Sequence, residues 1–155
     1  NGNLLLNVVQ TPEGDLEQDV LDVLEEIAEW IPANGEGIYG TRPWKIYGEG
    51  PSTIKQERGR FGGVRDIRPY TSEDYRFTTK GSALYAFCME PPENEFRIIS
   101  LGKTANPEKR KIKSVSLLGS DIKPEWDQTE DALVISNPSG LPEWKVVGFK
   151  IEFRR

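Results

Sequence analysis

Carboxylates are the side chains of this 155-residue sequence that could do acid and base chemistry. Four of them lie close together in one stretch: Asp22, Glu25, Glu26 and Glu29. Paired carboxylates can act as general acid and general base. These four also fit the polar face of an amphipathic helix with no matching cation, and a solvated face is the usual role of such a charge run. We therefore interpret them as a helix surface and not as a catalytic pair.

Histidine and cysteine chemistry is nearly absent from the composition. The sequence contains no histidine, which excludes a Ser-His-Asp triad, a Cys-His dyad and His-ligated metal sites within these residues. Cys88 is the single cysteine and has apolar neighbours, so we interpret it as a small hydrophobe inside a strand. A lone cysteine forms neither an intrachain disulfide nor a cysteine zinc cluster. We expect no metal site and no cofactor.

Tryptophan rings could form flat platforms for sugars, because their faces combine apolar area with a quadrupole. The candidates are Trp44, Trp126 and Trp144. A place in the core or between domains is the more frequent role of tryptophan in a small β-domain. We expect Trp44 to be the anchor at a junction between two domains.

A basic stretch could indicate a nucleic-acid site, since cationic and aromatic residues interleave in it. It contains Arg58, Arg60, Phe61, Arg65, Arg68 and Tyr70. The whole chain is acidic, however, with 25 Asp and Glu against 20 Lys and Arg and a formal charge of −5. No run of about 18 apolar residues is long enough to span a bilayer. We expect neither nucleic acid nor a membrane as a partner.

The elements that must position these side chains begin with one strand and one helix. Residues 4–9 are apolar on both faces of an extended strand, which is typical of a strand in a covered parallel sheet. Asp15 is the expected N-cap of a helix that begins at Leu16 and that Pro32 and Asn34-Gly35 should end. A single βα unit cannot cover its own strand. Because the sequence also begins without Met or a signal peptide, we expect residues 1–42 to be the last βα unit of a longer α/β domain.

Short strand-like runs separated by Gly, Pro, Asn and Asp follow from Trp44 onward. The predicted strands are 44–47, 75–79, 83–89, 96–101, 112–118, 132–136 and 146–153. Residues 79–82 are typical of a tight hairpin, and residues 48–69 of a long connecting loop. The sequence therefore predicts a mainly β protein, with an antiparallel β-sandwich over residues 43–155.

Several motifs occur in one order along the chain. They are NGNLLLNV at 1–8, EWI at 29–31, NGEGIYGTRPW at 34–44, YGEGP at 47–51, RFTTKG at 76–81, LYA at 84–86, VSLLGS at 115–120 and FKI at 149–151. Together they resemble the α-L-fucosidases of glycoside hydrolase family 29. The resemblance covers nearly the whole chain.

The resemblance implies a (β/α)₈-type barrel followed by a C-terminal β-sandwich, of which this chain would hold the last barrel strand and helix. It also implies a retaining glycosidase that releases terminal α-L-fucose from glycans, with two carboxyl groups about 5 Å apart as nucleophile and acid/base. In the family both groups come from earlier barrel positions. We therefore expect the fragment alone to be inactive and to meet fucosylated glycan only through the missing barrel. Family members are usually secreted or periplasmic.

Asn7 and Gln10 are the candidates for the rim of the substrate site. The family commonly has Gly-Pro after the last barrel strand, where this sequence has Val9 and Gln10, and active sites lie at that end of the barrel. The other interpretation of Asn7 is a polar side chain that fixes the turn before the helix.

Two further interpretations of the whole chain stay open. A carbohydrate-binding module would hold glycans on exposed rings, and an exposed Trp126 or Trp144 beside a groove would favour it. The other is an interaction domain without a ligand. The idea of a truncated barrel depends on residues 4–9, and it fails if later segments of this chain enclose them.

Overall fold

The computed structural model describes residues 4–54, 68–105 and 107–154, and the described chain is mainly β. One long helix, α1 (Gln18–Asn34), comes first. The strands are β1 (Arg42–Glu49), β2 (Tyr75–Lys80), β3 (Ala83–Cys88), β4 (Glu95–Ile98), β5 (Ile112–Leu117), β6 (Trp126–Gln128), β7 (Leu133–Ser136) and β8 (Val147–Phe153). The short 3₁₀ helices are η1 (Gly35–Gly37), η2 (Pro51–Thr53) and η4 (Ile99–Leu101).

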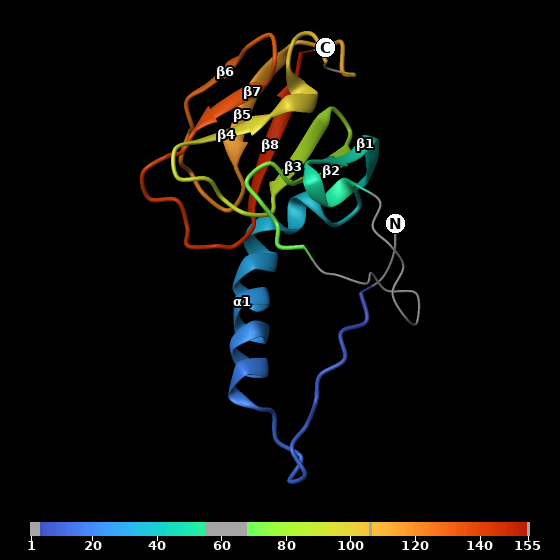
Figure 1. Cartoon of the computed structure of the whole chain (residues 1–155), viewed down its shortest axis with the longest axis vertical. Helices are drawn as coiled ribbons and strands as arrows, with labels where there is room; N and C mark the ends of the chain where they lie inside the picture. Colours follow the sequence, from blue (N-terminus) through green and yellow to red (C-terminus); the bar gives the residue numbers. More distant parts are fainter. Residues whose placement is uncertain (1–3, 55–67, 106, 155) are drawn as a thin grey trace.

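Two antiparallel sheets form the sandwich that the strand pattern predicts. The larger sheet has the order β1-β2-β3-β8-β5, and the smaller sheet has the order β4-β7-β6. Figure 1 shows the two sheets stacked at one end of the molecule, with α1 projecting away from them. The antiparallel β-sandwich is therefore confirmed.

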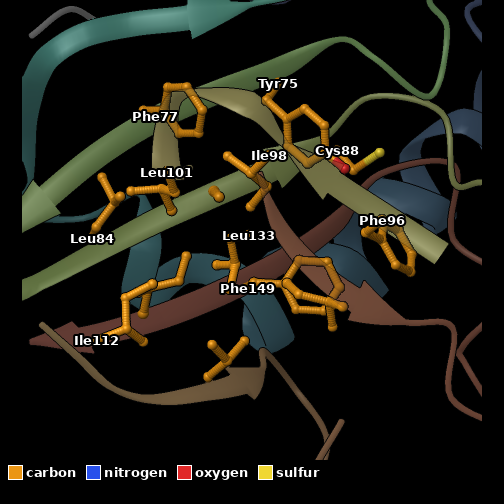
Figure 2. Close-up of a cluster of buried hydrophobic side chains, with 14 of the residues drawn as sticks. Tyr75, Phe77, Leu84, Cys88, Phe96, Ile98, Leu101, Ile112, Leu133 and Phe149 are labelled. Carbon is orange, nitrogen blue, oxygen red and sulfur yellow. The ribbon is translucent and has the colours of Figure 1, made fainter. Parts of the chain in front are cut away.

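The main core lies between the two sheets, because alternate side chains of each strand point to opposite faces. Phe149 of β8 meets Phe96 of β4 edge to face, with ring centroids 4.8 Å apart. Ile98 and Leu133 of the smaller sheet are fully buried in the same core. Figure 2 shows these side chains gathered between the strands.

Strand β3 is buried on both faces. Leu84, Ala86 and Cys88 point into the main core, whereas Tyr85 and Phe87 belong to a second apolar cluster on the outer face of the larger sheet. Trp30 of α1 packs against this second cluster. The outer face of the sheet is therefore the surface on which the end of the helix rests. The buried position of Cys88 agrees with its interpretation as a small hydrophobe.

The hairpin predicted at residues 79–82 is present. Lys80 pairs with Ala83 across a two-residue loop, and Gly81 in that loop has φ +60°, a conformation that glycine adopts at low cost. The long connection predicted at 48–69 is only partly observed. Its first two residues belong to β1 and η2 follows, while residues 55–67 lie outside the described ranges.

The predicted start of the helix was wrong; at its end, the stop signal at Asn34 and Gly35 was right and the one at Pro32 was not. α1 is preceded by Glu17 as its N-cap residue and not by Asp15, and it continues past Pro32 to Asn34. A proline costs one backbone hydrogen bond inside a helix. The last turn is held all the same: Trp30 Nε1 donates to the carbonyl of Val146 at 2.7 Å, and the side-chain amide of buried Asn34 donates within the helix to the carbonyl of Trp30 at 3.2 Å.

Two strand predictions also need correction. The predicted strand 96–101 ends at Ile98, and the chain turns into η4 because the backbone N–H groups of Ile99 and Ser100 donate to the carboxylate of Glu49, both at 2.8 Å. The prediction also missed β6, which is only three residues long and carries a single apolar side chain, Trp126. Such a strand has too little alternation to be recognised in a sequence.

Residues 4–9 form no strand in this structure. An extended segment needs a hydrogen-bonded neighbour to become part of a sheet, and the described chain offers it none beyond an isolated bridge between Gln10 and Leu16. Leu4 is 84% and Leu5 93% exposed. The later segments that the structure describes therefore do not enclose this apolar stretch. The division into two domains at residue 42 stays a prediction.

Candidate functional site

The residues predicted for the substrate rim lie apart from the sandwich. Asn7 and Gln10 are both exposed, and within the described residues neither side chain makes a hydrogen bond. Their role at a substrate site stays a prediction.

Trp44 lies in the main core of the sandwich. Its ring packs edge-on against Phe77, with centroids 5.3 Å apart, and only 9% of the residue is exposed. This buried position gives it a packing role within the sandwich, while its role as a domain anchor stays a prediction.

The four carboxylates on α1 are exposed, as a solvated helix face requires. Glu26 is the only one of the four with an ion pair among the described residues, to Lys145 at 3.3 Å. The described residues hold no group of three or more His, Cys, Asp or Glu side chains that could bind a metal ion. They also hold no helix long and apolar enough to cross a membrane.

A groove of about 520 Å³ lies where α1 meets the outer face of the larger sheet. Its floor is aromatic and aliphatic, and the rings of Trp30 and Phe87 are 5.8 Å apart and tilted by 49°. Trp144 and Val146, just before β8, form a second wall, and Ile38 closes one end. Three segments that are distant in sequence therefore build one apolar depression.

The end of α1 is tied to the sheet by specific hydrogen bonds beside this groove. The indole Nε1 of Trp30 donates to the carbonyl of Val146 at 2.7 Å. Gly37 follows the helix in η1, and its carbonyl accepts a hydrogen bond from Thr78 Oγ1 of β2 at 2.6 Å. Gly37 sits so close to β3 that a Cβ there would lie 2.7 Å from Phe87 Cζ. The direction of α1 relative to the sandwich is thus fixed.

Glu36 forms a second tie between η1 and the sheet. Its Oε1 accepts hydrogen bonds from Tyr85 Oη, at 2.9 Å, and from Lys150 Nζ. The hydrogen bond from Lys150 lowers the pKa of Glu36, so the carboxylate stays charged at neutral pH. Burial, followed by the hydrogen bond to Glu36, raises the pKa of Tyr85 to about 12.

The polar groups that line the groove are mostly engaged inside the chain. Arg76 donates to Ser52 Oγ at 2.7 Å and to the carbonyl of Tyr75 at 2.9 Å. Thr78 Oγ1 donates to the carbonyl of Gly37 in η1. By contrast, Glu29 and Glu143 on the rim have no ion pair within the described residues.

The apolar face of α1 continues from this groove and is uncovered. Val23 is 52% and Ile27 38% exposed, and Ile27 also lines the groove. Figure 1 shows that only the C-terminal end of α1 touches the sheets. The described chain therefore leaves this side of the helix without a packing partner at Val23 and Ile27.

Sequence reasoning missed Trp30 and Glu36. Trp30 carries a usable signal, because it follows Ile27 at helical spacing and so lies near the apolar face of α1. Glu36 carries none, since Tyr85 and Lys150 are brought to it only by the pairing of β3 with β8.

The fold is a β-sandwich, and the outer face of its larger sheet holds the C-terminal end of α1. The rest of α1 carries an apolar face that the described chain leaves uncovered. Residues 68–152 match the family described as "Alpha-L-fucosidase C-terminal domain", and residues 1–36 match the family "Alpha-L-fucosidase". The chain belongs to the α-L-fucosidase family.

Individual relatives agree with this assignment. The chain is 29% identical over 142 residues to a tissue α-L-fucosidase of Homo sapiens, a match that covers 91% of this chain and 25% of the relative. A putative α-L-fucosidase of Caenorhabditis elegans is 25% identical over 158 residues, covering 98% of this chain and 32% of the relative. The chain thus spans about a quarter to a third of the length of these relatives.

Solved structures share the fold. α-L-Fucosidase isoenzyme 1 from Paenibacillus thiaminolyticus superposes with a TM-score of 0.63 and 24% identity, over 99% of this chain and 31% of that chain. The α-fucosidase of Thermotoga maritima gives a TM-score of 0.64 and 20% identity, over 97% of this chain and 30% of that chain.

Proposed function

We propose that this chain is the C-terminal part of an α-L-fucosidase, in which α1 and the residues before it complete a catalytic barrel that the sandwich supports. One observation carries the proposal. Within residues 1–36, which match the family "Alpha-L-fucosidase", the described apolar side chains of Leu4, Leu5, Val23 and Ile27 are exposed.

The uncovered surface is energetically significant. Fully burying a Leu or Val side chain contributes about 1.5–3 kcal/mol relative to leaving it exposed. Leu4, Leu5, Val23 and Ile27 all stand at 38% exposure or more. A barrel packed against these side chains would gain several such contributions, so the segment is suited to a covered position.

The complete protein would then hydrolyse terminal α-linked L-fucose from glycans with retention and without a cofactor. Retention requires a nucleophile and an acid/base about 5 Å apart. Two carboxylates of α1, Glu26 and Glu29, line the groove, but both are exposed and Glu26 is ion-paired with Lys145. Both catalytic groups would therefore come from the barrel, and this chain would act by holding the barrel's last helix.

An assay with an aryl α-L-fucoside tests this proposal. We expect turnover by the complete protein, meaning this chain together with the barrel that precedes it, and none by residues 1–155 alone. The matched control is the chain carrying Glu29→Gln. Turnover by residues 1–155 that disappears in this variant would overturn the proposal.

A carbohydrate-binding module is the second candidate, because Trp144 is half-buried beside a groove. Sugar recognition needs hydroxyl partners as well as an aromatic platform, and the polar side chains here are largely bonded to the chain itself. Calorimetry with fucosylated oligosaccharides distinguishes the two, and we expect no heat of binding from residues 1–155. We further propose secretion or a periplasmic location, as is usual in the family, and cell fractionation tests it.

A further inference from the structure

We propose that the groove between Trp30 and Trp144 is a socket for a segment of the catalytic barrel that carries an apolar side chain next to a Lys or Arg. This inference rests on the proposed function. It adds where the barrel and the sandwich contact each other, and the chemistry of the barrel segment that fills the groove.

The apolar part of the segment follows from the floor of the groove. Phe87 and Trp30 provide one wall and Trp144 another, and Ile27 joins this surface to the uncovered apolar face of α1. A partner that covers the helix face must therefore pass over the mouth of the groove. A side chain inserted there loses water on all sides, which is the usual environment of an interface anchor.

A sugar is a poorer occupant than a protein segment. Arg76 and Thr78 are held by hydrogen bonds to Ser52 and Gly37, and Glu26 is paired with Lys145. A sugar in the groove would find Glu29 and Glu143 as acceptors at the rim, but its hydroxyl groups over the apolar floor would lack partners, each at a cost of about 1–3 kcal/mol. An aliphatic or aromatic side chain carries no such cost.

The cationic part follows from the charge around the groove. Residues 1–41 contain nine Asp and Glu but no Lys or Arg. Glu29 of α1 and Glu143 of the opposite wall both line the groove, and neither has an ion pair among the described residues. Complementary charge at an interface favours the correct partner and opposes like-charged ones. Three carboxylates (Glu26, Glu29 and Glu143) and two cations (Arg76 and Lys145) line the groove, so its net charge is negative and a Lys or Arg beside the anchor would offset it.

Photocrosslinking in the complete protein tests the socket. Glu143 is replaced by p-benzoylphenylalanine, and the matched control carries the same replacement at exposed Lys103, which lies after η4 on the side of the smaller sheet. We expect position 143, and not position 103, to crosslink to a barrel peptide that contains Lys or Arg beside an apolar residue. Crosslinks from 143 only to a second copy, only within residues 68–154, or nowhere would overturn the inference. The same replacement at Lys145 repeats the test if the first variant does not fold.

A charge reversal tests the cationic part separately. In the complete protein, Glu29→Lys with Glu143→Lys should shorten the half-life at a fixed elevated temperature by about tenfold, which corresponds to 1.4 kcal/mol. Glu125→Lys, an exposed reversal away from the groove, should leave the half-life unchanged. Equal half-lives for the two variants would overturn the cationic part.

The fucoside assay on the same preparations separates the two proposals. Turnover by the complete protein without the crosslink from position 143 would refute the socket and leave the proposed function standing. The crosslink without turnover would refute the proposed function and leave the contact between barrel and groove standing.

Discussion

The hydrogen bond between Trp30 and Val146 is the contact through which α1 is held most directly to the sandwich. The indole Nε1 donates to the carbonyl at 2.7 Å, and the same ring packs against Phe87. Trp30→Phe keeps an aromatic ring but removes the donor, leaving a half-buried carbonyl unpaired. We expect a loss of about 1 kcal/mol in the free energy of unfolding from the hydrogen bond alone.

Trp30→Ala should cost more, because it also removes the ring from the cluster. Truncating a fully buried Trp or Phe to Ala costs about 3–5 kcal/mol. Trp30 is only half-buried, so about half of that range applies. With the lost hydrogen bond added, we expect a total of about 3 kcal/mol.

The assay is urea-induced unfolding of residues 1–155 followed by far-ultraviolet circular dichroism, since fluorescence would change with each tryptophan removed. Trp126→Phe is the matched control. Trp126 is also half-buried against the core, but its indole makes no hydrogen bond within the described residues. The difference between the two Phe variants therefore isolates the hydrogen bond. If both unfold at the same urea concentration, the hydrogen bond does not hold the helix, and our reasoning is refuted.

Two further predictions concern close packing and charge. Gly37→Ala should destabilise the chain by about 1–3 kcal/mol, because the new methyl would meet Phe87 Cζ at 2.7 Å, whereas Gly35→Ala meets only an exposed ring at 3.1 Å and should cost less in thermal unfolding. The hydrogen bonds from Arg110 lower the pKa of Glu108 to about 2, so this pair stabilises the fold above pH 4.5 and loses its contribution as the pH falls toward 2. Arg110→Ala should return the pKa of Glu108 toward 4.5 in a carboxyl titration by nuclear magnetic resonance, and an unchanged midpoint would contradict this assignment.

The proposed role of the sandwich depends on the rigidity of its junction with α1. Trp30, near the end of α1, and Glu36, in η1, both form hydrogen bonds to the sandwich. A helix fixed in this way presents its apolar face in one direction only. In the proposed role, the sandwich would therefore help to set the position of α1.

The sequence by itself determined most of the strands, because their side chains alternate between a buried and an exposed face or are apolar throughout. β3 and β8 were found within one residue at each end for this reason. The hairpin at 79–82 was equally visible, since Gly81 marks a turn whose geometry is local. For residues 4–9 the sequence predicted a strand in a covered sheet, whereas the described chain leaves them exposed and without a strand neighbour.

Only the tertiary structure decided where α1 ends and where the groove lies. Pro32 would end an isolated helix, but the burial of Asn34 and the bond from Trp30 to Val146 hold the last turn in place. The groove itself combines α1, β3 and the segment before β8, which are brought together by strand pairings that no local pattern encodes. Periodicity reports which face of an element is apolar, whereas the neighbour that each face meets depends on the packing of the whole chain.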